Sequence, residues 1–158
     1  MNILESNSVE KIGIRWGLIT FVLLSVFFLL MKLLGFVQIL ELRFLNAFIM
    51  FFGCYMAIRT AKINLKNFRY FKGLAAGGLN GLTASLIFIV FGFIYVTVID
   101  SDFRYEIKMN EPLGLYFNIY VALFQIFMEG VGSGFLFSFI IMQWMKVPRV
   151  VSEERNIS

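Results

Sequence analysis

Four long apolar segments constrain the fold of this chain more than any other feature. They run over residues 14–36, 44–58, 74–99 and 115–145, the second being short and the fourth long. A helix that crosses the hydrocarbon of a bilayer needs about 20 apolar residues, each rising about 1.5 Å. Charged residues make up only 15% of the 158 residues, whereas soluble domains contain roughly 25%. The sequence therefore predicts an all-α polytopic membrane protein with four transmembrane helices in one domain, residues 14–145, between tails of residues 1–13 and 146–158.

The charges between these segments predict how the chain crosses the membrane. Residues 59–73 carry five basic and no acidic side chains, whereas residues 100–114 carry four acidic and two basic ones. Because basic loops favour the cytoplasmic side, we expect both termini in the cytoplasm, with ten of the 14 basic residues on that side. Trp16, Tyr70 and Trp144 then fall near the inner interface, where amphipathic rings are common.

The residue types that are missing exclude several classes of function. The chain has no histidine, so it lacks the most frequent metal ligand and the usual near-neutral proton carrier. Its single cysteine, Cys54, lies in an apolar segment and is interpreted as a packing residue. The acidic residues of the 100–114 loop match no EF-hand spacing, which indicates a solvated loop. We expect no enzymatic activity, no cofactor and no nucleic-acid partner, and we assign the net charge of +4 to contacts with anionic lipid headgroups.

Small residues recur every four positions in two of the segments and predict close helix packing. Such stripes let two helix backbones approach closely. A helix of the same chain or of a neighbouring chain could fill them, and contact between the third and fourth segments is the favoured interpretation. The glycines could instead loosen the fourth helix and free carbonyl groups to coordinate an ion. The stripes are Gly73, Gly77, Gly81 and Ser85 in the third segment, and Gly130 and Gly134 in the fourth.

A single acidic residue stands inside the fourth apolar segment. Glu129 lies about 22 Å from Trp144 along a helix, and a charge at such a depth costs at least about 2.5 kcal/mol. It therefore needs a partner, a cavity or a pathway, which makes Glu129 the leading candidate functional residue. If the first helix continues past Lys32, that side chain lies about 24 Å from Trp16. The shared depth predicts an ion pair between Lys32 and Glu129, in which each charge lowers the cost of the other.

Other arrangements of these polar residues stay open. Lys32 could extend to the outer headgroups, while Glu129 is protonated or hydrogen-bonded to Gln125 or Asn118. Asn80, in the third segment, could join the interior polar network or form one interhelical hydrogen bond. The candidate intramembrane polar site consists of Glu129, Lys32, Asn80 and Gln125.

Several short stretches resemble a known protein family. They are residues 15–19 (RWGLI), 69–73 (RYFKG) and 99–103 (IDSDF), together with the glycine-rich fourth segment. In these stretches the chain resembles the family called domain of unknown function 4199, small four-helix membrane proteins found mainly in Bacteroidota. The resemblance extends over residues 11–147 and implies a four-helix bundle in a bacterial inner membrane. It implies no activity, and it transfers no functional residues.

Size and composition favour a protein that works by association. The first hypothesis is an accessory or assembly subunit, surrounded by membrane lipids, that uses its glycine stripes to form a homo-oligomer or to join a larger membrane complex. The alternative is a small proton or cation transporter or channel that depends on Glu129 and encloses its pathway as an oligomer.

Overall fold

Long helices make up almost all of the chain that the structure, a computed structural model, describes, which is residues 8–36, 40–65, 68–99 and 118–145. Each of the four long helices is long and apolar enough to cross a membrane. Within the described ranges, the prediction of an all-α protein with four such helices is confirmed. The helices are α1 (Val9–Leu33), α2 (Leu40–Asn64), α3 (Tyr70–Ile94) and α5 (Ile119–Trp144), and the π-helical turn η1 (Tyr95–Ile99) continues α3.

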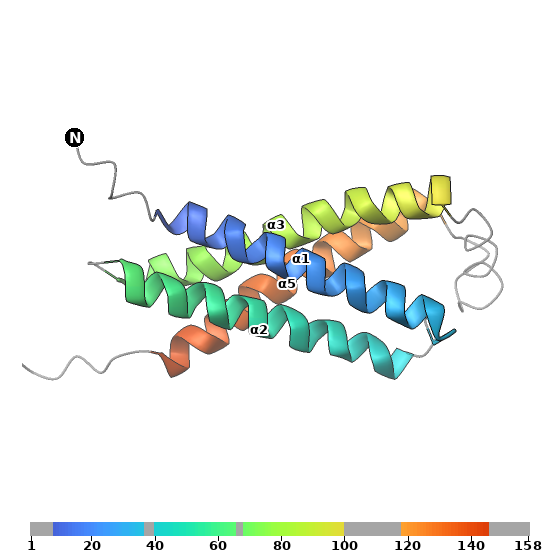
Figure 1. Cartoon of the computed structure of the whole chain (residues 1–158). Coiled ribbons are helices and arrows are strands. Elements are labelled where there is room, and N and C mark those ends of the chain that lie inside the picture. Colours follow the sequence, from blue (N-terminus) through green and yellow to red (C-terminus); the bar gives the residue numbers. More distant parts are fainter. Residues whose placement is uncertain (1–7, 37–39, 66–67, 100–117, 146–158) are drawn as a thin grey trace, which may run out of the picture.

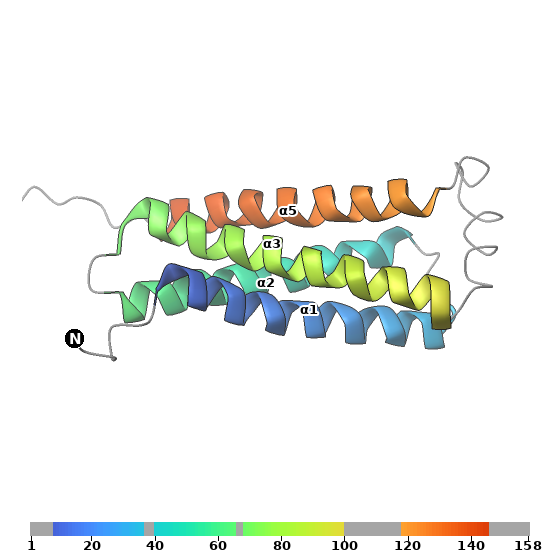
Figure 2. The same ribbon diagram turned by 90° about the horizontal axis from the view of Figure 1, so that it is seen from above.

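The four long helices form an up-and-down bundle in which α1 and α5 lie at diagonally opposite positions. Successive helices point in opposite directions, and α1 begins at the end of the bundle where α5 finishes (Figure 1). Helix α3 contacts all the other long helices, and its contacts with α1 and α5 are more extensive than its contact with α2. Both α1 and α5 also pack on α2. Figure 2 shows α1 and α5 along opposite edges of the bundle, with α3 between them. The assignment of the shared end to the cytoplasm stays a prediction.

Helix α1 is shorter at its C-terminal end than its apolar segment suggests. Its N-cap is Ser8, whose side chain accepts a hydrogen bond from the backbone N–H of Lys11 at 3.4 Å. The helix ends at Leu33 because Gly35 adopts a positive φ of 72°, a backbone conformation that glycine adopts without the strain of a Cβ atom. Lys32 therefore lies in the last turn of α1, where a cation interacts favourably with the helix dipole, and the helix continues only one residue past it.

Helix α2 is longer than the apolar segment from residues 44 to 58. It continues through Arg59 and Lys62 to Asn64, and both basic side chains are exposed. A long basic side chain can reach the headgroups with its charged end while its own helix backbone lies in apolar surroundings. A basic residue therefore does not mark the end of such a helix. Most of the predicted 59–73 loop is therefore helical, and α3 begins at Tyr70.

Bulky apolar side chains cover the outside of the bundle, and small ones fill much of its centre. Ala57, Ala61, Ala76 and Ala84 are fully buried, whereas Phe48 is 72% exposed. Between α1 and α3, other aromatic rings fill gaps in edge-to-face contacts, and these include Phe21, Phe28, Phe88, Phe91 and Tyr95. Such an arrangement suits a bundle surrounded by lipid, because small interior residues let the helices approach closely.

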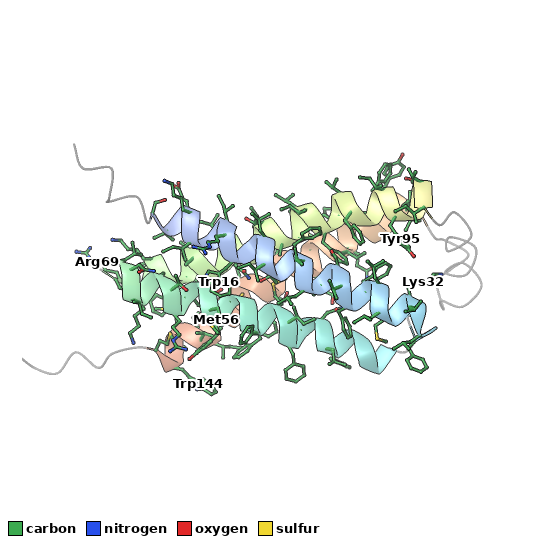
Figure 3. The ribbon with its side chains drawn as sticks, viewed as in Figure 1. Trp16, Lys32, Met56, Arg69, Tyr95 and Trp144 are labelled. Carbon is green, nitrogen blue, oxygen red and sulfur yellow. The ribbon has the colours of Figure 1, made fainter. Side chains whose placement is uncertain are left out.

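Hydrogen bonds between side chains join the helices at the end where α1 begins. Trp16 donates its indole N–H to the hydroxyl of Thr60 at 2.9 Å, and Gln143 donates its amide N–H to the hydroxyl of Tyr70 at 3.1 Å. Figure 3 shows Trp16, Arg69 and Trp144 toward this end, and Lys32 and Tyr95 toward the other. These five side chains thus lie toward the two ends of the bundle, as expected for two membrane interfaces.

Candidate functional site

The two small-residue stripes that the sequence indicated pack against each other along α3 and α5. A Cβ atom added at Gly81 would lie 2.7 Å from the Cα of Gly134, and one added at Gly134 would lie 2.8 Å from the Cα of Gly81. The two backbones are therefore in direct contact, and neither position can hold a side chain. Each step of four along α3 corresponds to a step of four back along α5, giving the pairs Gly73–Met142, Gly77–Ser138, Gly81–Gly134 and Ser85–Gly130.

This seam, the contact between the small-residue stripes of α3 and α5, buries the surfaces that the association hypothesis had assigned to a partner. Gly73, Gly77 and Gly81 are all buried, and α5 of the same chain covers them. Both α3 and α5 remain α-helical through their glycines. The stripes therefore hold the bundle together, and neither an unwound ion site nor a docking surface for a second chain is present at these positions.

Asn80 lies at the centre of the bundle and connects its helices. Its side chain is fully buried. Its amide oxygen accepts a hydrogen bond from the hydroxyl of Thr20 on α1 at 2.9 Å. Its amide nitrogen donates to the Sγ atom of Cys54 at 3.5 Å and to the Sδ atom of Met50 at 3.8 Å, both on α2. Asn80 therefore forms a network and not the single interhelical hydrogen bond that was its alternative.

Cys54 extends this network to α5. Its thiol is fully buried and lies 3.6 Å from the backbone oxygens of both Gly77 and Gly134, to which it donates. A weak thiol donor can serve two carbonyl groups only because the glycine seam brings α3 and α5 so close together. Sequence reasoning interpreted Cys54 as packing and did not identify Thr20. The signal that points to Thr20 is its place seven residues after Gly13 and three after Gly17, on the face of α1 that contacts α3.

Glu129 lies on the outward side of α5, away from this network. It is ten residues after the first residue of α5 and fifteen before the last, which places it near the middle of the helix. Its side chain is exposed, and it has no hydrogen bond or ion pair with any residue in the described ranges. Gln125, one turn earlier, is exposed as well. No hydrogen bond joins the side chain of Glu129 to the side chain of Gln125 or of Asn118, the described residues considered as its partners. Asn118 instead caps α5 by accepting from the N–H of Tyr120 at 3.0 Å.

The structure does not bring Lys32 and Glu129 together. Lys32 is half-buried in the last turn of α1 and interacts with other groups. Helices α1 and α5 lie on opposite edges of the bundle (Figure 2), and among the described residues no ion pair joins Lys32 to Glu129. The prediction compared only depth along the helices, whereas an ion pair also requires that both side chains point toward each other. The four carboxylates of the loop interpreted as solvated, Asp100, Asp102, Glu106 and Glu111, lie outside the described residues.

Comparison with known proteins now gives the family. No curated protein and no solved structure matches the chain. The model of a family described as protein of unknown function (DUF4199) matches residues 15–111, which include Thr20, Cys54 and Asn80 but end before α5. The matched range is narrower than the resemblance suggested, and Glu129 lies outside it. Because the match covers more than half of the 158 residues, the chain belongs to the DUF4199 family of proteins of unknown function.

Proposed function

We propose that this protein is a non-enzymatic, multi-pass protein of the bacterial inner membrane that works by lateral association, as an accessory or assembly subunit. The surface that associates is the outer face of α5, defined as Val121, Gln125, Glu129, Gly132 and Leu136. The glycine stripes are not this surface, because they are covered within the chain. What supports the inner membrane is the resemblance to DUF4199 proteins, together with four helices able to cross a bilayer.

The observation that carries the proposal is the contrast between Glu129 and its surroundings. Every residue of the outer face is exposed, and Glu129 has no partner in the described part of its own chain. Leaving a carboxylate in hydrocarbon costs at least about 2.5 kcal/mol. A neighbouring protein that supplies hydrogen-bond donors would remove part of this cost, so Glu129 favours the associated state over the isolated chain.

The test is the mass of the particle that contains the chain. The tagged full-length protein is purified from its membranes in a mild detergent, and native mass spectrometry determines the mass of wild type and Glu129→Leu. We expect wild type to be heavier than a single chain and Glu129→Leu to move toward the mass of one chain. Glu10→Leu is the matched control, because it removes an exposed carboxylate in the first turn of α1. A wild-type protein that is a solitary monomer in mild detergent and in nanodiscs contradicts the proposal.

A second candidate function is proton or cation transport that depends on Glu129. What favours it is the same exposed carboxylate near the middle of a membrane-spanning helix, since ionisable groups at such depths often serve proton or ion pathways. Because Glu129 points out of the bundle, the pathway would have to lie between two chains. Flux of protons or monovalent cations into liposomes that is present in wild type and lost in both Glu129→Gln and Glu129→Leu supports transport. Equal flux in all three excludes it.

A further inference from the structure

Two arginines lie on neighbouring helices at the end of the bundle where α1 begins. Trp16 on α1 donates its indole N–H to the hydroxyl of Thr60 on α2 at 2.9 Å, so these two residues lie at similar depths. Arg15 directly precedes Trp16, and Arg59 directly precedes Thr60. Both arginines are exposed. They therefore flank the same hydrogen bond from two different helices.

Both arginines point to the same side of the α1–α2 pair. On α1, Gly13 and Gly17 contact α3, and Arg15 lies two residues from each, about 160° around the helix. On α2, the thiol of Cys54 contacts backbone oxygens of α3 and α5, and Arg59 lies five residues later, about 140° around the helix. Each arginine therefore faces away from α3. Figure 1 views the bundle from this side, with α5 passing behind α1 and α2.

Neither arginine is neutralised by the described part of the chain. Neither guanidinium has a hydrogen bond or ion pair with any residue in the described ranges. Glu10 is the one acidic side chain that the structure describes at this end, and it lies five residues before Arg15, about 140° around α1 from it. Arginine keeps its charge at any physiological pH, and like charges repel more strongly near hydrocarbon than in water. The pair therefore favours an anion from outside the chain.

An apolar stripe extends from each arginine toward the middle of the bundle. On α1, Val22 and Val26 lie seven and eleven residues after the arginine. On α2, Phe52 and Phe48 lie seven and eleven residues before it. These steps return to within about 20° of the starting direction around a helix, and all four side chains are exposed. The two apolar stripes thus share a side of the bundle with the two charges.

The depth and chemistry of this surface select a lipid as its occupant. Helix α1 has 25 residues, which gives about 37 Å against about 30 Å of hydrocarbon. Arg15 lies six residues after the first residue of α1, about 9 Å along the helix, and its long stem can carry the guanidinium to the headgroups. The guanidinium fork matches a phosphate with two parallel hydrogen bonds. A phospholipid brings a phosphate to this level and acyl chains to the stripes below it.

We propose that Arg15 and Arg59 together bind the phosphate of one anionic phospholipid, whose acyl chains lie along the two apolar stripes. A lipid with a net negative charge offsets part of the double positive charge, whereas a zwitterionic lipid brings a cation of its own. All the residues of this site belong to one chain, so the site does not depend on the proposed association through α5.

Native mass spectrometry measures the binding of single lipids. The full-length protein in detergent is titrated with phosphatidylglycerol or with phosphatidylcholine of the same acyl chains, and the dissociation constant of the first bound lipid is determined. We expect wild type to bind phosphatidylglycerol more tightly. Arg15→Gln and Arg59→Gln should each raise that constant about five-fold, which corresponds to about 1 kcal/mol. Equal affinity of wild type for the two lipids, or an unchanged constant in both variants, overturns the proposal.

Arg69→Gln is the charge-matched control. Arg69 is an exposed arginine at the same end of the bundle, but it directly precedes α3 and has no partner among the described residues. Its loss should raise the constant less than about two-fold, because exposed charges that are far apart are screened from each other. All three variants should unfold at the temperature of wild type, as is usual for exposed positions. A five-fold effect of Arg69→Gln would mean that the lipid responds to total charge, and it overturns the two-arginine site.

Competition distinguishes a lipid from a free anion. Inorganic phosphate replaces chloride at constant ionic strength, and we expect phosphatidylglycerol to stay bound to wild type. Displacement would mean that the arginines hold a soluble anion, and it overturns the lipid. None of these outcomes changes the mass of the particle purified from membranes, so the lipid site and the association through α5 fail separately.

Discussion

The centre of α3 and the outer face of α5 each hold a polar residue, but only the one in α3 has hydrogen-bond partners for its side chain. Asn80 is fully buried and makes hydrogen bonds to α1 and α2, so its amide is satisfied within the chain. The carboxylate of Glu129 is exposed and has no hydrogen bond or ion pair in the described part of the chain. Both residues lie near the middle of helices that can cross a membrane. Their difference separates a polar group that stabilises the fold from one that requires something outside it.

The same contrast occurs between two glycines of α5. Gly134 contacts the backbone of α3, whereas Gly132, two residues earlier, faces open space. A helix advances by about 100° per residue, because it has about 3.6 residues per turn, so two residues place a side chain on nearly the opposite face. The inner side of α5 is therefore committed to the bundle, and its outer side is available to a partner.

The largest effect is expected from placing one side chain at each of these glycines. Gly134→Leu forces its side chain into the backbone of Gly81, so we expect a loss of at least about 3 kcal/mol of stability, or no folded protein, since overpacking alone often costs about 1–3 kcal/mol. Gly132→Leu should fold as well as wild type, because a side chain added there meets no atom of the chain within 4 Å. Thermal unfolding in detergent measures the stability of both variants. A Gly132→Leu variant as unstable as Gly134→Leu would contradict the assignment of inner and outer sides.

The next largest effect is expected when the two kinds of polar residue are each replaced by leucine. Asn80→Leu leaves the hydroxyl of Thr20 without its acceptor in the interior, and an unsatisfied buried group costs about 1–3 kcal/mol. Gln125→Leu should leave the unfolding of the detergent-solubilised monomer within about 0.5 kcal/mol, as is usual for exposed positions. Chemical unfolding of the monomer checks both variants. If Gln125→Leu destabilised the monomer as much as Asn80→Leu, the outer face would belong to the fold.

Local pattern was enough to predict the four helices and the seam between two of them. Apolar length indicated the spans, and the spacing of Gly73, Gly77, Gly81 and Ser85 places these four residues on one face of a helix whatever surrounds it. The direction of Glu129 was also within reach, because it lies nine residues before Ser138 and therefore about 180° around the helix from it. If the small-residue stripe faces α3, Glu129 must face away.

Other features depend on the arrangement of the helices and not on their sequences alone. Lys32 and Glu129 are far apart because α1 and α5 lie at diagonally opposite positions in the bundle. The depth of each residue along its own helix does not reveal this. The contacts of Asn80 with Thr20 and Cys54 join residues 60 and 26 positions apart in the sequence. No single helix carries the information that these three side chains converge. Hydropathy also overlooked two helix boundaries, since Gly35 ends α1 and α2 continues past the exposed Arg59 and Lys62 to Asn64.

A smaller effect tests whether the interior hydrogen bond is a direct coupling. A double-mutant cycle combines Thr20→Val with Asn80→Leu and measures the unfolding free energy of the monomer. We expect a coupling of about 0.6 kcal/mol, with about 1.7 as an upper end, as found for interhelical hydrogen bonds in membranes. The control cycle pairs Thr20→Val with Gln125→Leu, which should be additive because the residues share no contact. Additivity in both cycles would mean that the Thr20–Asn80 hydrogen bond contributes nothing specific.

The smallest effect, and the sharpest test of the contrast between the two regions, is expected for Lys32 and Glu129. Helices α1 and α5 lie on opposite edges of the bundle, so the unfolding free energies of Lys32→Met and Glu129→Leu should add within about 0.5 kcal/mol in the double variant. Breaking a true buried ion pair by removing one partner would instead cost about 3–5 kcal/mol, and removing both would restore much of it. The measurement is made on the monomer, where no second chain can satisfy Glu129. A strong coupling there would mean that the chain neutralises Glu129 by itself, and the outer face of α5 would then have no charge that calls for a partner.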